Sequence, residues 1–146
     1  GGGVEVHADG GTVPIVGVFN GCRYTDPTTK KETFSNFYPA STNAADIEAF
    51  IIDDPMVVFE IQAAIAFPVA DLLGNFDVVY TTAGSTVTGI SGAELQVTDG
   101  GTATTLPLKV IDISQDPENS DVGSAHTNVL CVIENHIFGV KGAGLA

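Results

Sequence analysis

Positive charge is scarce in this sequence. Five lysines and arginines stand against 18 aspartates and glutamates, which gives a formal net charge of −13 at pH 7. Proteins that bind duplex nucleic acid or anionic lipid present a basic face to the phosphates. Five basic side chains are too few to form such a face, so the composition argues against nucleic acid and against a membrane surface as partners.

Tryptophan is absent, methionine occurs once, and the chain has no long hydrophobic run. No stretch approaches the roughly 20 apolar residues that a membrane-spanning helix needs. Hydrophobic residues make up 44% and charged residues only 16% of the chain, whereas disordered chains are rich in charge and poor in apolar residues. The 146 residues therefore predict one folded domain.

Cysteine is also rare. Cys22 and Cys131 are the two cysteines, too few for a disulfide scaffold. Each lies in or beside an apolar stretch, which favours two buried free thiols that behave as small hydrophobic residues. A disulfide between them and a catalytic cysteine are the alternatives.

Local motifs of catalysis and cofactor binding are missing. The sequence has no Gly-x-Ser-x-Gly elbow, no Walker loop and no Gly-x-Gly-x-x-Gly. His7, His126 and His136 lack the local spacing of zinc ligands. We therefore expect no enzymatic activity, no cofactor and no resident metal.

Two acidic segments need an interpretation. Asp53 and Asp54 precede Pro55, and adjacent acids on a strand point to opposite faces, so a turn is favoured over a shared metal or proton. The segment 116–121 holds three acids and an asparagine. An ordinary solvated loop is the favoured interpretation, and an oxygen-coordinated cation is the alternative, although the spacing differs from that of an EF-hand.

Short β-branched runs alternate with glycine, proline, asparagine and aspartate along the chain. This punctuation is typical of an all-β domain. It predicts a small β-barrel or β-sandwich of seven to nine short antiparallel strands with one short helix. The expected strands are 13–19, 22–24, 33–38 (or a bound loop), 49–53, 56–62, 77–80, 94–98, 105–114 and 128–138, with a helical turn at 68–73.

Turn motifs and the composition of the two ends predict the turns and the bounds of the domain. Asn20-Gly21 and Asp99-Gly100-Gly101 are expected to be turns. Residues 13–138 are expected to form the single β-rich domain, after a flexible N-terminal segment 1–12 and before a flexible tail 139–146. The chain starts with three glycines and no methionine, so we expect either that an N-terminal piece was removed or that a longer chain precedes it.

Apolar alternation predicts which strand residues face the core. The helical turn is expected to be about one or two turns long, with Val69, Leu72 and Leu73 on one face at i, i+3, i+4 spacing. In the strands, the expected core residues are Phe59, Ile61, Leu108, Val110 and Ile113. In segment 128–138, Val129, Cys131 and Ile133 are expected to share one face, and Leu130, Val132 and Glu134 the other.

Basic and aromatic residues gather near the start of the domain. Arg23, Lys30 and Lys31 are three of the five basic residues, and aromatic residues stand beside them. One interpretation is a set of core aromatics next to an exposed loop. The other is a docking surface, because interface centres favour tyrosine, phenylalanine and arginine. The candidate docking residues are Arg23, Tyr24, Lys30, Lys31, Phe34, Phe37 and Tyr38.

An ordered series of segments carries a family resemblance. The segments are Val16–Cys22, Asp53–Gln62, Gly84–Leu95, Leu108–Asn119 and Asn128–His136. In this order they resemble small virion structural proteins of tailed bacteriophages, of the capsid decoration or cement kind, over about residues 13–138. The resemblance implies a β-rich subunit, often trimeric, that bridges neighbouring major capsid proteins and in many cases docks by an N-terminal arm. It carries over no catalytic residue.

The function expected from this resemblance is non-enzymatic. A decoration subunit would bind the major capsid protein and its own copies, as a homotrimer, on the outer capsid surface of a virion assembled in the host cytoplasm. The alternative is a receptor- or carbohydrate-binding β-domain of a head fibre or tail, which the absence of tryptophan and the three tyrosines disfavour. A hydrolase on a small barrel is a third hypothesis, and no local motif supports it.

Overall fold

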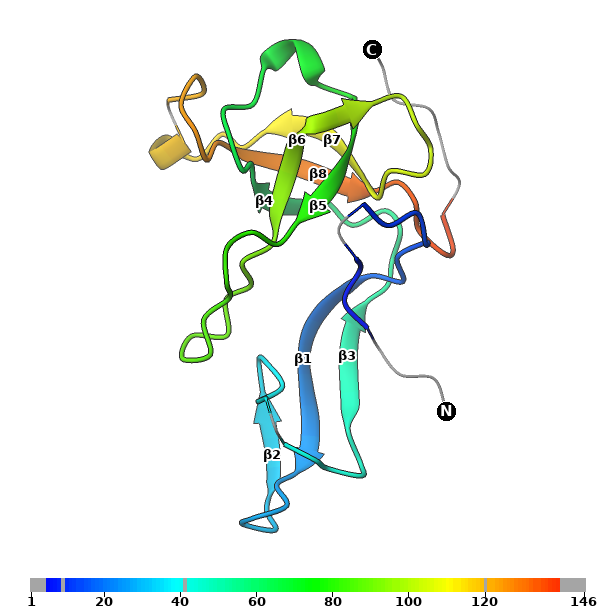
Figure 1. The fold of residues 1–146 in the computed structure, drawn as a ribbon, viewed down its shortest axis with the longest axis vertical. Coiled ribbons are helices and arrows are strands. Elements are labelled where there is room, and N and C mark those ends of the chain that lie inside the picture. Colours follow the sequence, from blue (N-terminus) through cyan, green and yellow to red (C-terminus); the bar gives the residue numbers. More distant parts are fainter. Residues whose placement is uncertain (1–4, 9, 41, 120, 140–146) are drawn as a thin grey trace.

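Two antiparallel sheets make up the fold. The computed structural model describes residues 5–8, 10–40, 42–119 and 121–139. One sheet has the strand order β4-β8-β7-β5-β6 and the other the order β2-β1-β3 (Figure 1). The strands are β1 (Val18–Thr25), β2 (Glu32–Ser35), β3 (Glu48–Ile52), β4 (Phe59–Gln62), β5 (Asn75–Val79), β6 (Glu94–Gly101), β7 (Leu108–Ile113) and β8 (Asn128–Ile133).

The five-stranded sheet holds the hydrophobic core, and we call this part the body. Val129, Cys131 and Ile133 share one face of β8, as predicted, and the structure shows that this is the buried face. Phe67 and Phe76 meet edge to face with their ring centroids 5.5 Å apart. Phe59 and Ile61, Leu108, Val110 and Ile113 also face this core, which confirms their predicted direction.

The three-stranded sheet extends away from the body along the long axis of the molecule (Figure 1). We call residues 18–52 the arm. Gly21, Cys22 and Tyr24 are its only buried residues among those the structure describes. The arm is therefore a thin structure with almost no core of its own.

Asn20-Gly21 is not a hairpin turn, and this prediction was wrong. The strand β1 continues through it, and the pairing of β1 with β3 shifts register between Phe19 and Cys22. Gly21 has φ +110°. The backbone freedom of glycine that suits a turn also suits a β-bulge, and here the bulge lets one strand carry on where two strands were expected.

Two further local predictions were wrong. Asp99-Gly100-Gly101 belongs to β6 instead of ending it. The helical turn is a single 3-10 turn, η1 (Val69–Asp71), and Val69 and Leu73 are exposed while Leu72 packs against the core. One turn is too short to bury a complete face. A second 3-10 turn, η2 (Pro117–Asn119), lies in the loop between β7 and β8.

The predicted fold class is confirmed: the chain is all-β with short antiparallel strands and very little helix. Within the described residues the two sheets stay open, and no closed barrel forms. None of the helices in the described part of the chain could cross a membrane. The predicted flexible tail lies, except for Gly139, outside the described residues, and the flexibility of segment 1–12 stays a prediction.

Candidate interaction surface

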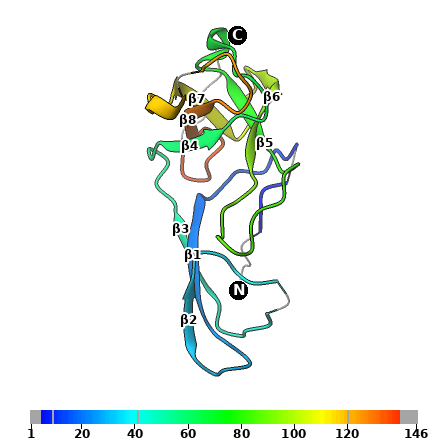
Figure 2. The ribbon, with the colours of Figure 1, turned by 90° about the vertical axis from the view of Figure 1, so that its left-hand side faces the viewer.

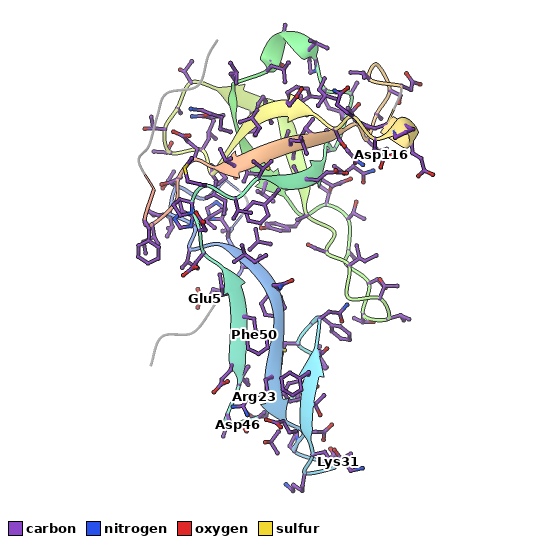
Figure 3. All side chains as sticks on the ribbon, turned by 180° about the vertical axis from the view of Figure 1, so that it is seen from behind. Glu5, Arg23, Lys31, Asp46, Phe50 and Asp116 are labelled. Atoms are coloured by element: carbon purple, nitrogen blue, oxygen red, sulfur yellow. The ribbon has the colours of Figure 1, made fainter. Side chains whose placement is uncertain are left out.

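The tip of the arm carries two lysines. Asp26 shapes the turn between β1 and β2, because its Oδ1 accepts hydrogen bonds from the amides of Thr28 at 2.7 Å and Thr29 at 2.9 Å. These backbone bonds lower the pKa of Asp26. The amide of Lys30 donates to the carbonyl oxygen of Asp26, and Lys30 itself has φ +60°. Lys30 and Lys31 are exposed on this fixed turn (Figure 3).

Arg23 lies on the same sheet, between two carboxylates. Its guanidinium is paired with Glu32 on β2 and with Glu48 on β3, where Nη2 and Oε1 are 2.9 Å apart. Hydrogen bonds to Glu48 and Glu32 raise the pKa of Arg23 further above its ordinary value. Arg23 therefore links the three strands, and its charge is already matched within the arm.

One face of the arm is covered by the segment that follows β2, and we call it the covered face. Tyr24, on β1, meets Tyr38 edge to face with centroids 5.3 Å apart. The thiol of Cys22 donates to the carbonyl oxygen of Phe37 at 3.7 Å. The hydroxyl of Tyr38 donates to the backbone carbonyl oxygen of Thr42 at 2.6 Å. Tyr24 is buried, and Phe37 and Tyr38 are half-buried. These three predicted docking residues are packed inside the arm, where Tyr24 is out of reach of a partner.

The opposite face of the arm is uncovered, and we call it the open face. Phe34 and Glu48 pair with Arg23 from either side, and Phe50 follows two residues after Glu48, so all four share this face. Phe34 is 66% and Phe50 43% exposed. Figure 2 shows the strands edge-on, with the covering segments on one side and, along β1 and β2, no described segment on the other. Figure 3 looks onto the open face, where Phe50 and Arg23 lie on adjacent strands.

A shallow hollow of about 320 Å³ lies between the two phenylalanines of the open face. Gly21, which has no side chain, forms part of its floor, with Asn20 and Ser35 nearby. Phe50 was not among the docking residues predicted from the sequence. The signal that could have found it was the alternation of Glu48, Phe50 and Ile52 in a segment already expected to be a strand.

The β5–β6 loop, residues 80–93, extends from the body beside the arm (Figure 1). The Nδ2 of Asn36 donates to the carbonyl oxygen of Thr88 at 2.7 Å, and a Cβ on Gly89 would collide with the Asn36 side chain. Val87 is 90% and Ile90 69% exposed in this loop. Their exposure adds apolar surface next to the arm that the sequence analysis did not single out.

Both cysteines are free and buried. Cys22 lies in the arm and Cys131 in the body, so the alternative of a disulfide between them was wrong. Burial raises the pKa of Cys131 to about 12 and also raises that of Cys22. A thiol with a raised pKa is a poor nucleophile at neutral pH, which disfavours a catalytic role.

The acidic segment after β7 uses its polar groups locally. Asp116 Oδ1 accepts the amide of Glu118 at 2.9 Å. The amide group of Asn119 donates to the carbonyl oxygens of Ser114 and Asn128, and its Oδ1 accepts the amide of Asn128. Across the residues described, no group of three or more histidines, cysteines or carboxylates is placed to hold a metal ion.

Comparison of the chain with protein-family models, with curated proteins and with solved structures finds no significant match.

Proposed function

We propose that the protein is a non-enzymatic capsid decoration subunit that binds the outer surface of a major capsid protein lattice and stabilises the expanded head, as a homotrimer. The observation that carries the proposal is the arm with the neighbouring β5–β6 loop. Together they extend from the body and expose Phe34, Val87 and Ile90. A thin structure of this kind buries little apolar surface by itself, and exposed apolar patches mark interaction sites.

The charge distribution supports a surface protein. The chain carries a net charge of −13, and a strongly acidic coat limits clumping of particles and adhesion to nucleic acid. A subunit present in many copies needs only a modest contact per copy, because linked contacts give high avidity. Binding only to the expanded lattice would stabilise that lattice by mass action.

Head binding tests the proposal. The wild-type chain should cosediment with expanded heads of the phage that encodes it and should bind precursor heads at least about tenfold more weakly, since a difference of 1.4 kcal/mol corresponds to that factor. The variant Val87→Asp/Ile90→Asp should bind expanded heads at least about tenfold more weakly than wild type, because it places charges on the exposed apolar loop.

The matched control is Val69→Asp/Ala70→Asp, which adds the same two charges to exposed residues of η1 on the body. It should bind heads as wild type does. A wild-type chain that ignores expanded heads would overturn the proposal, and equal losses in the loop variant and the control would remove the loop from the docking surface.

A receptor- or carbohydrate-binding β-domain is the second candidate. The hollow between Phe34 and Phe50 favours it, because exposed aromatic rings offer stacking platforms to sugars. Selective hits on a glycan array that disappear in the variant Phe34→Thr would place this function first.

A further inference from the structure

The open face of the arm carries exposed phenylalanines beside the mutually paired Arg23, Glu32 and Glu48, and among the described residues no segment covers it. Sheets bury an apolar face against another layer, and three strands gain independent stability from such packing. The covered face has its layer in the segment after β2, whereas Phe34, Phe50 and Val18 remain exposed on the open side. Antiparallel sheets often leave one face in water, but a cluster of exposed apolar side chains on that face marks an interaction site.

The distribution of charge indicates which occupant fits. The arm holds three basic and four acidic residues, a net charge of −1, whereas the rest of the chain holds two basic and fourteen acidic residues, a net charge of −12. Two bodies of this charge repel each other strongly, whereas two arms repel each other only weakly. An arm-against-arm contact with antiparallel arms places the two acidic bodies at opposite ends of the pair, which limits their repulsion.

The order of charges along the arm is self-complementary. Lys30 and Lys31 lie at the tip, and Asp53 and Asp54 follow β3 directly at the base. Phe50 lies between these two ends (Figure 3). The cross-strand pairs support this spacing, because Val18 pairs with Ile52 toward the base and Thr25 pairs with Glu32 toward the tip.

We propose that the open face is a two-fold interface between two copies of this chain whose arms lie antiparallel. Phe34 and Phe50 pack against the partner's Phe34 and the partner's Phe50, and the lysines of each tip meet the partner's Asp53 and the partner's Asp54. A two-fold axis brings one patch against the same patch of a second copy, and this patch matches itself both in apolar centre and in charged ends. The inference goes beyond the proposed function, since it holds whatever lattice the protein binds.

Sedimentation of the purified chain tests the apolar centre. The wild type should sediment as a dimer, or as a hexamer in which this two-fold interface joins two of the proposed trimers. A wild type that stops at an isolated trimer would lack the two-fold interface and would overturn the proposal. Phe34→Thr/Phe50→Thr should raise the dissociation constant at least about 30-fold, the effect of losing an interface hot spot of 2 kcal/mol. Both side chains are exposed, so the variant should keep the wild-type circular dichroism spectrum. A monomeric wild type, or an assembly that this variant leaves intact, overturns the proposal.

Charge reversal tests the two-fold arrangement itself. The tip variant Lys30→Asn/Lys31→Glu changes the charge by −3, and asparagine suits the left-handed backbone of Lys30. The base variant Asp53→Lys/Asp54→Asn changes it by +3, and asparagine keeps the side-chain oxygen that accepts the amide of Met56. Each variant alone should associate at least about tenfold more weakly than wild type, since a loss of 1.4 kcal/mol has that effect.

A mixture of the two variants should associate again. In the mixed dimer the glutamate tip of one copy meets the lysine base of the other, and the remaining tip and base are both wild type. The control Glu118→Lys/Asp121→Asn makes a charge change of +3 at exposed residues of the β7–β8 loop and should leave association unchanged. If the mixture stays dissociated, the lysine tip contacts some other acidic surface and the two-fold interface is excluded. These experiments contain no heads, so their failure leaves the decoration proposal standing.

Discussion

Two carboxylates hold the end of the arm together where hydrophobic packing is missing. Asp26 accepts the amides of Thr28 and Thr29 within the turn. Asp46 accepts the amide of Thr25 at 3.0 Å and its hydroxyl at 2.6 Å. These hydrogen bonds lower the pKa of both aspartates. Because hydrogen bonding favours the ionised form, the order of the tip depends on these two negative charges.

Acid should therefore loosen the tip. A carboxyl group whose pKa is lowered by folding stabilises the fold above its unfolded pKa, and that contribution is lost as pH falls through the folded pKa. We expect protection of the Thr25, Thr28 and Thr29 amides against hydrogen exchange to fall below about pH 4, after correction for the intrinsic exchange rate.

The variant Asp26→Asn distinguishes the contribution of Asp26 to this pH dependence from that of Asp46. It should remove the pH dependence at Thr28 and Thr29 and leave that of Thr25, which belongs to Asp46. Wild-type protection at Thr28 and Thr29 that stays constant across this pH range would contradict the role given to Asp26.

At the scale of the elements, the strand β6 contains two consecutive glycines, Gly100 and Gly101, whose surroundings differ. A Cβ on Gly100 would collide with the ring of Phe76 in the core, whereas a Cβ on Gly101 would meet nothing within 4 Å. Phe76 is 1% exposed and packs against Phe67, so its ring has little room to yield. Gly100 therefore lets β6 cross the edge of the core closely.

Alanine at these two positions should separate packing from backbone effects. Gly100→Ala should lower the free energy of unfolding by about 1–3 kcal/mol, the usual cost of overpacking a core. Gly101→Ala should change it by no more than about 0.5 kcal/mol. Urea denaturation of both variants measures the difference, and equal values would show that Phe76 moves aside without strain.

The molecule as a whole combines a packed body with a weakly packed arm. Twelve buried side chains form the core cluster of the body, whereas in the arm Cys22 and Tyr24 are the buried side chains within the described residues. Local stability follows buried apolar contact. The arm should therefore open without the body unfolding, unless a partner covers its open face.

Hydrogen exchange measured by mass spectrometry can detect this difference. In the variant Phe34→Thr/Phe50→Thr, which the two-fold interface predicts to be monomeric, peptides of β1 and β3 should exchange at least about tenfold faster than peptides of β7 and β8, since local opening costs less than global unfolding. In the wild type at high concentration the difference should shrink. Uniform protection of arm and body in the variant would show that the arm is held by contacts within the chain.

The sequence by itself determined the all-β class and the elements whose own alternation shows which face is buried. In β4, Phe59 and Ile61 alternate with Glu60 and Gln62, and the core direction follows from the period of a strand. It also pointed to the basic and aromatic segment that became most of the arm. Local signals of this kind survive folding because each depends on residues that are neighbours in the chain.

Only the tertiary structure decided how these pieces are used. Glycine freedom serves a turn or a bulge equally well, so the role of Gly21 depends on whether β3 lies beside β1. Likewise Tyr24 and Phe34 look alike in the sequence, but the segment after β2 folds over one face of the sheet and leaves the other open. Which aromatic side chains remain exposed is set by contacts between residues far apart in the chain, and no local pattern records those contacts.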